Sequence, residues 1–334
     1  MKLMKRLTII LLGVLLAWPA LAQTKLKLGT LVPKGSSPDQ SLKLMAEAWR
    51  TAPDGGVAVT IYSDGVLGGE ADMVRRMRIG QIQAGLLSGI GLAQIDDSVT
   101  ALQTMPLVYR TLDEVDYVRE KLHAQLEQKF TDKGFIVLFW TDAGWVKCFS
   151  RKPVIMPNDL AQQKFFVWAG DSKSRDIIKA AGFQPIPLET MDILPGLQTW
   201  LIDAVPCPPF FALAGQFYGP APHMLDMNWS PLAGALVITK KVWNGLAPAT
   251  QQALRVAAAK AGNDIRVQAR KEMDESVTAM QQHGLQVHKL TPEAEAAWRK
   301  VAADSLPRIR GSLVPADMFD EVQRLLAEYR AGQK

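Results

Sequence analysis

The stretch that decides the fold is Pro157–Pro187, PNDLAQQKFFVWAGDSKSRDIIKAAGFQPIP. It contains an apolar, aromatic and β-branched run at Lys164–Trp168, which is typical of a buried strand. The polar turn after this run offers Asp171 or Ser172 as the N-cap of a helix. That helix ends at Gly182, a common C-terminal signal. The stretch therefore predicts one strand–turn–helix unit of an α/β fold.

Two aromatic residues at the end of this strand are candidates for ligand contact. Strand alternation places Phe166 and Trp168 on the face opposite Phe165. Ligands of open α/β sheets bind beyond the carboxyl ends of the strands, where Trp168 lies. We therefore expect Phe165 to pack in the core and Phe166 and Trp168 to face a ligand, with core packing as the alternative for Trp168.

The preceding part of the chain repeats the same strand–helix pattern. Strands are expected at Leu26–Leu31, Val57–Tyr62 and Ala84–Leu87, with helices between them. This β-α-β order predicts a parallel sheet covered by helices. The glycine turn at Val66–Glu70 fits neither a P-loop nor a dinucleotide fingerprint, so no nucleotide cofactor is expected.

Two crossings between separate domains are expected, and a long helical segment follows them. Phe135–Trp140 and Trp145–Ser150 are strands joined by a short link, and Trp229–Ile238 is a strand that returns. Thr250–Gln282 has one nearly continuous helical pattern, which at 1.5 Å per residue would span about 50 Å. The alternative is two shorter helices broken at Gly262.

The first 22 residues have the pattern of a secretory signal peptide. A basic start precedes the apolar run Leu7–Trp18 and the small-x-small site Ala20-Leu21-Ala22. An uncleaved anchor is the alternative, but the run is short for a membrane span. Removing residues 1–22 lowers the formal net charge from +5 to +2, which leaves nucleic-acid binding without support. The four histidines are scattered, so no metal site is expected.

Several motifs together resemble a known family. The chain from residue 24 to 334 resembles the solute-binding subunits of TRAP (tripartite ATP-independent periplasmic) transporters. This resemblance rests on the glycine turn, on the long late helix, and on the short motifs Asp64–Glu70, Gly80-Gln81-Ile82, Asp159-Leu160, Leu197-Gln198 and Ile202-Asp203.

The resemblance implies a two-lobe, type II-like periplasmic binding fold, with crossing strands and a long helix spanning both lobes. We expect residues 23–146 and 231–265 to form the first lobe, and residues 147–230 and 266–334 the second. A protein of this kind resides in the periplasm, closes on a solute between its lobes and delivers it to a membrane permease. It is not an enzyme.

The sequence departs from the family pattern at the expected carboxylate clamp. Counted from Asp159, the usual arginine position holds Phe166. A second arginine position corresponds to Val146 or Lys147, and a usual polar position falls near Cys207. The departures resemble a subgroup with aromatic-lined clefts, some of whose members work with a helical-repeat partner protein. They disfavour a dicarboxylate, because lysine supplies only a point charge.

The expected cleft lining contains many aromatic residues, which predicts an apolar or aromatic solute with at most one carboxylate, paired with Lys147. Two members have alternatives: Trp140 could fill the hinge core, and Glu70 could serve the start of its helix. The lining is expected to comprise Leu31, Val32, Glu70, Ser88, Trp140, Trp145, Lys147, Phe166, Trp168, Cys207, Phe210 and Trp229.

Three further expectations complete the sequence reading. A disulfide between Cys148 and Cys207 is expected, because both fall in the exported part and in the same expected lobe. Gly144 and Gly262 are expected to absorb the bend of lobe closure. The rival functions are a periplasmic sensor that uses the same cleft and a periplasmic hydrolase, for which no nucleophile motif is present.

Overall fold

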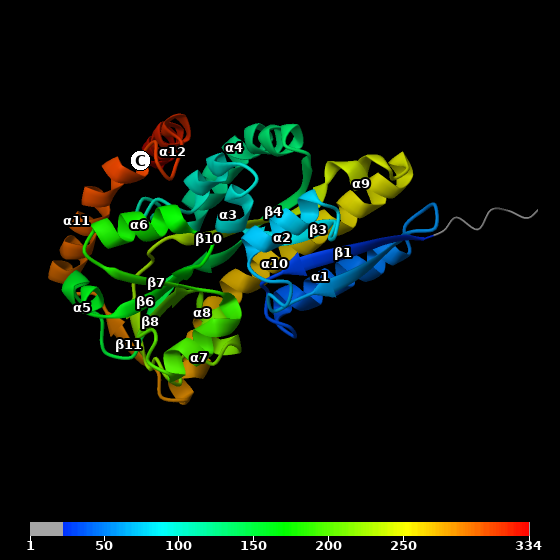
Figure 1. Ribbon diagram of the computed structural model, residues 1–334. Coiled ribbons are helices and arrows are strands. Elements are labelled where there is room, and N and C mark those ends of the chain that lie inside the picture. The colour runs from blue at the N-terminus through cyan, green and yellow to red at the C-terminus, as the bar shows by residue number, and fades with distance from the viewer. Residues whose placement is uncertain (1–22, 334) are drawn as a thin grey trace, which may run out of the picture.

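The computed structural model describes residues 23–333, which form two α/β lobes around separate sheets (Figure 1). The expected signal peptide and its cleavage site therefore lie outside the described residues. Within residues 23–333, no helix is both long and apolar enough to cross a membrane.

The first lobe is built on a five-stranded sheet with the order β2-β1-β3-β10-β4. Its first three strands are parallel, and β10 runs antiparallel between β3 and β4. The strands are β1 (Thr24–Thr30), β2 (Val57–Tyr62), β3 (Ala84–Ser88), β4 (Phe135–Trp145) and β10 (Pro231–Thr239). The helices are α1 (Ser37–Arg50), α2 (Glu70–Arg78), α3 (Gly89–Ala93), the 3-10 helix η1 (Asp97–Leu102), α4 (Leu112–Asp132) and α9 (Lys240–Asn244).

The second lobe is built on a six-stranded sheet with the order β11-β9-β5-β8-β6-β7. Its strands are β5 (Lys147–Ser150), β6 (Lys164–Trp168), β7 (Gln184–Leu188), β8 (Ala204–Cys207), β9 (His223–Asp226) and β11 (Gln286–Lys289). Its shorter helices are α5 (Pro157–Ala161), α6 (Ser172–Ala180), the 3-10 helix η2 (Thr190–Asp192), α7 (Ile193–Gln198) and α8 (Pro209–Ala214).

The stretch that decides the fold forms the predicted strand β6 and helix α6, and its lead-in forms the short helix α5. The Asp171 carboxylate caps α6 by accepting a 3.1 Å hydrogen bond from the backbone N–H of Ser174. Phe165 and Phe166 lie in different hydrophobic clusters on opposite faces of the sheet. Strand β7 was not predicted, because Pro185 and Pro187 are typical of turns; it lies at the edge of the sheet, where proline is tolerated.

Helix α10 (Pro248–Gln282) is one continuous helix of 35 residues, which excludes the alternative of two shorter helices. Figure 1 shows it passing from the first lobe to the second. Gly262 lies in its first half against β4, where a Cβ atom would be 2.5 Å from Cγ of Phe139. Glycine is therefore retained for close contact between helix and strand, which outweighs its poor helix propensity.

The C-terminal helices belong to different lobes. Helix α11 (Pro292–Ile309) packs on α5 and α6 of the second lobe, whereas α12 (Ala316–Gly332) packs on α4 and η1 of the first. Met318 and Leu325 of α12 share a buried cluster with Val115 and Leu122 of α4. The division between lobes therefore differs from the expected one, which placed all of residues 266–334 in the second lobe.

The crossing from β4 to β5 is held by a network of charges. Arg270 of α10 donates to Asp142 of β4 at 2.6 Å and to Asp116 of α4 at 2.7 Å. Arg119 adds a 2.7 Å ion pair to Asp116. The Asp142 side chain is 1% exposed, so its charge is compensated within the protein. We call these four residues the hinge network.

Candidate functional site

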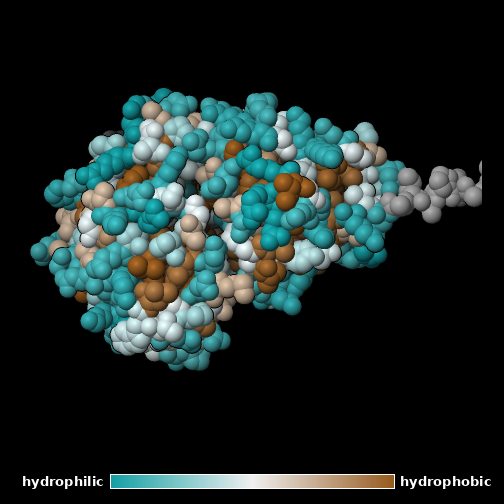
Figure 2. Space-filling view, viewed as in Figure 1, coloured by the Kyte–Doolittle hydropathy of each residue, from teal (hydrophilic) through white to brown (hydrophobic). Residues whose placement is uncertain are grey.

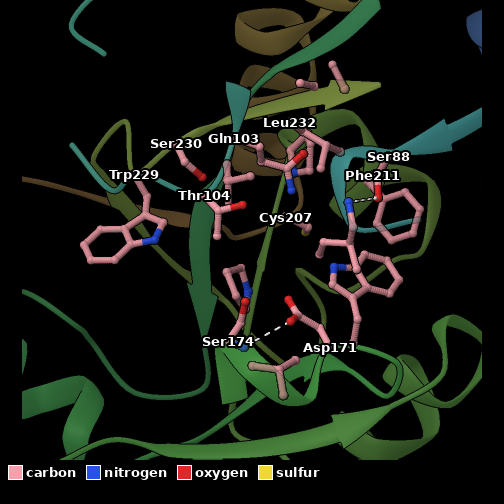
Figure 3. Close-up of a pocket in the computed structure, with 18 of the residues that line it drawn as sticks. Ser88, Gln103, Thr104, Asp171, Ser174, Cys207, Phe211, Trp229, Ser230 and Leu232 are labelled. Carbon is pink, nitrogen blue, oxygen red and sulfur yellow. Dashed lines mark hydrogen bonds between the residues drawn. The ribbon is translucent and has the colours of Figure 1, made fainter. Parts of the chain in front are cut away.

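A cavity of about 350 Å³ is lined by residues from both lobes. Its walls are mostly apolar, which suits a small ligand with an apolar body. Figure 3 shows side chains from both lobes converging on this space. In the outer view, charged and polar residues cover most of the visible face and apolar residues gather only in places (Figure 2).

Most of the predicted site residues are brought together at this cavity. Trp168 is half-buried and packs against the cores of both lobes. Its ring meets that of Phe166 edge-on, with 4.8 Å between the ring centroids. The predicted residues that line the cavity are Leu31, Val32, Glu70, Ser88, Lys147, Phe166, Trp168, Cys207, Phe210 and Trp229.

Two predicted tryptophans lie elsewhere, so their placement as cleft residues is wrong. Trp140 lies in the body of β4 and faces α4, where its Nε1–H donates to Glu127 and its ring packs on Phe130. Trp145 is the last residue of β4 and is buried in the core of the first lobe. Trp140 instead packs against the core of the first lobe, in line with the alternative given for it.

Glu70 orders the loop at the end of β3. Its carboxylate accepts hydrogen bonds from the Ser88 hydroxyl, from the Ser88 backbone N–H at 2.6 Å and from the Gly91 backbone N–H at 3.0 Å. Burial raises the pKa of Glu70, although these hydrogen bonds oppose the rise. Glu70 and Ser88 thus line the cavity while their polar groups are largely engaged with each other.

Lys147 does not offer the free cation that the sequence suggested. Its ammonium donates to the carboxylate of Asp226 at 2.7 Å and to the side-chain oxygen of Asn228 at 2.7 Å. Its side chain is 12% exposed. Asp226 ends β9 and Asn228 follows it; this strand was not predicted, so the pairing could not be anticipated.

The predicted disulfide is absent, and both cysteines are free. The register of β5 on β8 pairs Cys148 with Pro206 and Lys147 with Cys207. Adjacent positions of a strand point to opposite faces, so the two thiols are directed apart. Burial raises the pKa of the Cys148 thiol to about 12, and it raises that of Cys207 as well.

Several polar cavity residues were missed by sequence reasoning. Gln103 and Thr104 follow η1, an irregular part of the chain without a recognisable pattern. The Gln103 residue is 8% exposed, and its Oε1 has no hydrogen-bond partner among the described residues. Asp171 was predicted only as a helix N-cap, and Ser174 was not singled out. Ser230 completes this set, and the aromatic Phe211 was missed as well.

The cavity lining has an unusual ionic composition. Within residues 23–333 it contains no arginine, and Lys147 is its one basic residue. The same part of the chain holds no group of three or more residues suited to bind a metal ion. The arrangement can therefore enclose an apolar solute and hydrogen-bond to it, but it has no bidentate clamp for a carboxylate.

Comparisons with known proteins agree with this architecture. The family model DctP, described as bacterial extracellular solute-binding protein, family 7, matches residues 28–310. The chain is 27% identical over 279 residues to the 2,3-diketo-L-gulonate-binding periplasmic protein YiaO of Escherichia coli (strain K12), covering 80% of this chain and 82% of that one.

Two solved TRAP periplasmic solute-binding proteins have the same fold. One from Shewanella oneidensis, with bound succinate, has a TM-score of 0.84 at 17% identity, covering 91% of this chain and 100% of that one. One from Sulfitobacter sp. NAS-14.1, with bound β-D-galacturonate, has a TM-score of 0.82 at 18% identity, with the same coverage. These likenesses show the fold, and the family model, which covers most of the chain, shows that the chain belongs to the DctP family, bacterial extracellular solute-binding protein family 7.

Proposed function

We propose that this protein captures a small, largely apolar or aromatic solute with at most one carboxylate and delivers it to a TRAP membrane permease. The observation that carries the proposal is the cavity, whose walls are apolar and aromatic and whose described lining lacks arginine. Phe166 occupies the position at which the family resemblance places the arginine that clamps a carboxylate.

The energetics of burial favour such a solute over a dicarboxylate. Burying about 200 Å² of apolar surface contributes roughly 5 kcal/mol before the cost of ordering. A buried carboxylate without a partner costs several kcal/mol. With Lys147 engaged by Asp226, a dicarboxylate would leave at least one such charge.

The relatives named above bind polar acids. The solute proposed for this chain therefore belongs to a different chemical class from theirs. Their common fold supports the same general role, capture between two lobes, and the family places that role in the periplasm. We also propose a helical-repeat partner protein, and the support for it is the resemblance to the subgroup with aromatic-lined clefts. Co-purification of such a partner from the native organism would test this part of the proposal.

The test begins with mass spectrometry of any molecule that co-purifies with the protein. Calorimetric titration with succinate, galacturonate, phenylacetate and octanoate then ranks the solute classes. Trp168→Ala should weaken binding of the preferred solute by about tenfold or more, since tryptophan side chains often carry a large share of the binding energy. Trp200→Ala is the matched control, because Trp200 is 60% exposed and lies outside the cavity lining.

Two results would contradict the proposal. One is micromolar binding of succinate or galacturonate with no binding of phenylacetate or octanoate. The other is equal weakening by Trp168→Ala and Trp200→Ala, which would indicate that the ligand does not occupy this cavity.

A further inference from the structure

Most charged groups that line the cavity have partners within the protein. Asp142 is bound by Arg270, and Lys147 is bound by Asp226. Glu70 accepts three hydrogen bonds from Ser88 and Gly91. None of these groups is therefore left to decide the charge of a solute.

Asp171 differs from them. No lysine, arginine or histidine nitrogen of the described residues lies within 4.0 Å of its carboxylate oxygens, since Asp171 forms none of the ion pairs in this part of the chain. One oxygen accepts the 3.1 Å hydrogen bond from Ser174, and Figure 3 shows the carboxylate directed toward the space between the drawn side chains. The N-terminus of α6 compensates only about half a charge.

A second group on the opposite lobe also lacks a partner. Oε1 of Gln103 is buried, has no hydrogen-bond partner among the described residues, and belongs to a side chain that lines the same cavity. A buried amide oxygen left unpaired costs about 1–3 kcal/mol. This oxygen is enclosed by protein beside Gly89, so a solute in the cavity does not reach it, and Asp171 is left as the polar group that can act on the charge of a solute.

From these observations we infer that the cleft selects a solute with an aromatic or apolar body and a protonated amine, which pairs with Asp171. Trp168, Phe211 and Trp229 line the same cavity as Asp171, and aromatic faces attract an ammonium group. A carboxylate in the same place would be repelled by Asp171. This inference rests on the proposed function and names its solute class.

The experiment compares three probes matched in ring and chain: phenethylamine, phenethyl alcohol and phenylacetate. Calorimetry on the full mature protein should rank their affinities as amine, alcohol, acid, with about tenfold between amine and acid. Asp171→Asn keeps a good N-cap residue while it removes the charge. It should weaken the amine by about tenfold and leave the alcohol unchanged.

One further variant makes the result specific. Asp176→Asn removes a carboxylate from the same helix that is 67% exposed and outside the cavity lining, so it should change none of the affinities. Urea unfolding of each variant confirms that it is folded.

The outcomes separate this inference from the proposed function. If the acid binds as tightly as the amine, or if Asp171→Asn leaves the amine unchanged, the inference is wrong while an apolar solute class still stands. If none of the three probes binds at millimolar concentration and galacturonate does, both are wrong.

Discussion

Buried charges at the hinge are paired with opposite charges, whereas one carboxylate on the cleft wall is not. At the hinge, two arginines meet two aspartates, and the Asp142 side chain is 1% exposed. On the cleft wall, Asp171 has no cationic partner among the described residues, although it lies in a largely apolar cavity. The difference teaches that the paired charges fasten β4 to α4 and α10, whereas an unpaired charge beside an apolar surface is available to a ligand.

The largest expected effect comes from breaking the hinge network. Arg270→Ala leaves Asp142 buried without its main partner, so the free energy of unfolding should fall by about 3 kcal/mol. Urea denaturation measures the change. Lys260→Ala is the control, because its ion pair with Asp264 is solvent-exposed and should contribute about 0.5 kcal/mol or less. Equal effects of the two variants would contradict this account of the hinge.

Acid should weaken the same network. Burial alone would raise the pKa of Asp116, but the hydrogen bond from Arg270 and the charges of three arginines lower it overall. A lowered folded pKa contributes stability above the ordinary aspartate pKa of about 3.9, and that contribution is lost as the pH falls through the folded value. The stability difference between the wild type and Arg270→Ala should therefore shrink below about pH 4.

A smaller effect is expected where α10 touches β4. Gly262→Ala would place a methyl group 2.5 Å from the Phe139 ring, and overpacking of this kind costs about 1–3 kcal/mol. Gly332→Ala is a matched control, since Gly332 is also helical and has open space around it. Thermal unfolding compares the two. A stabilised Gly262→Ala variant would show that the close contact is unimportant.

The smallest expected effect concerns three carboxylates where the lobes approach each other. Burial raises the pKa of Glu189, and the charges of Asp72 and Asp192 raise it further. A raised folded pKa means that stability is greatest below the ordinary glutamate range and is lost as the pH rises through the folded value.

Glu189→Gln should therefore stabilise the protein at pH 7 by a few tenths of a kcal/mol, comparable to removing one like-charge pair. The gain should disappear near pH 4, where the glutamate is protonated. Urea titrations at the two pH values measure it. Glu275→Gln, at an exposed position of α10, should show no such dependence on pH.

The fold was largely predictable because its signals are local. Period-2 runs, glycine turns and caps marked β1, β2 and β6, and the capping role of Asp171 was confirmed. Strand β7 was missed because its prolines signal a turn, and only its place at the sheet edge makes them acceptable. The packing of α12 on the first lobe leaves no mark in its own sequence, whose apolar stripe would fit either lobe.

Cavity-lining residues at the ends of strands could be predicted from the sequence. Those that depend on contacts between distant segments could not. Trp168 follows from strand alternation and the location of ligand sites. The pairing of Lys147 with Asp226 depends on the register of β5 against β9, which the sequence does not reveal. Gln103 lies in an irregular segment, and its lack of a hydrogen-bond partner is visible only in three dimensions.

The return of α12 to the first lobe also constrains the order in which the chain folds. The cluster that contains Met73 and Leu122 is completed by Met318 and Leu325, from the end of the chain. Contacts between segments so distant in sequence slow folding, because a long loop must close before they form. The first lobe, although it starts at the N-terminus, cannot complete its core until the last helix has left the ribosome. The β-α-β part of this lobe therefore stays incompletely packed until a helix that is distant in sequence docks on it.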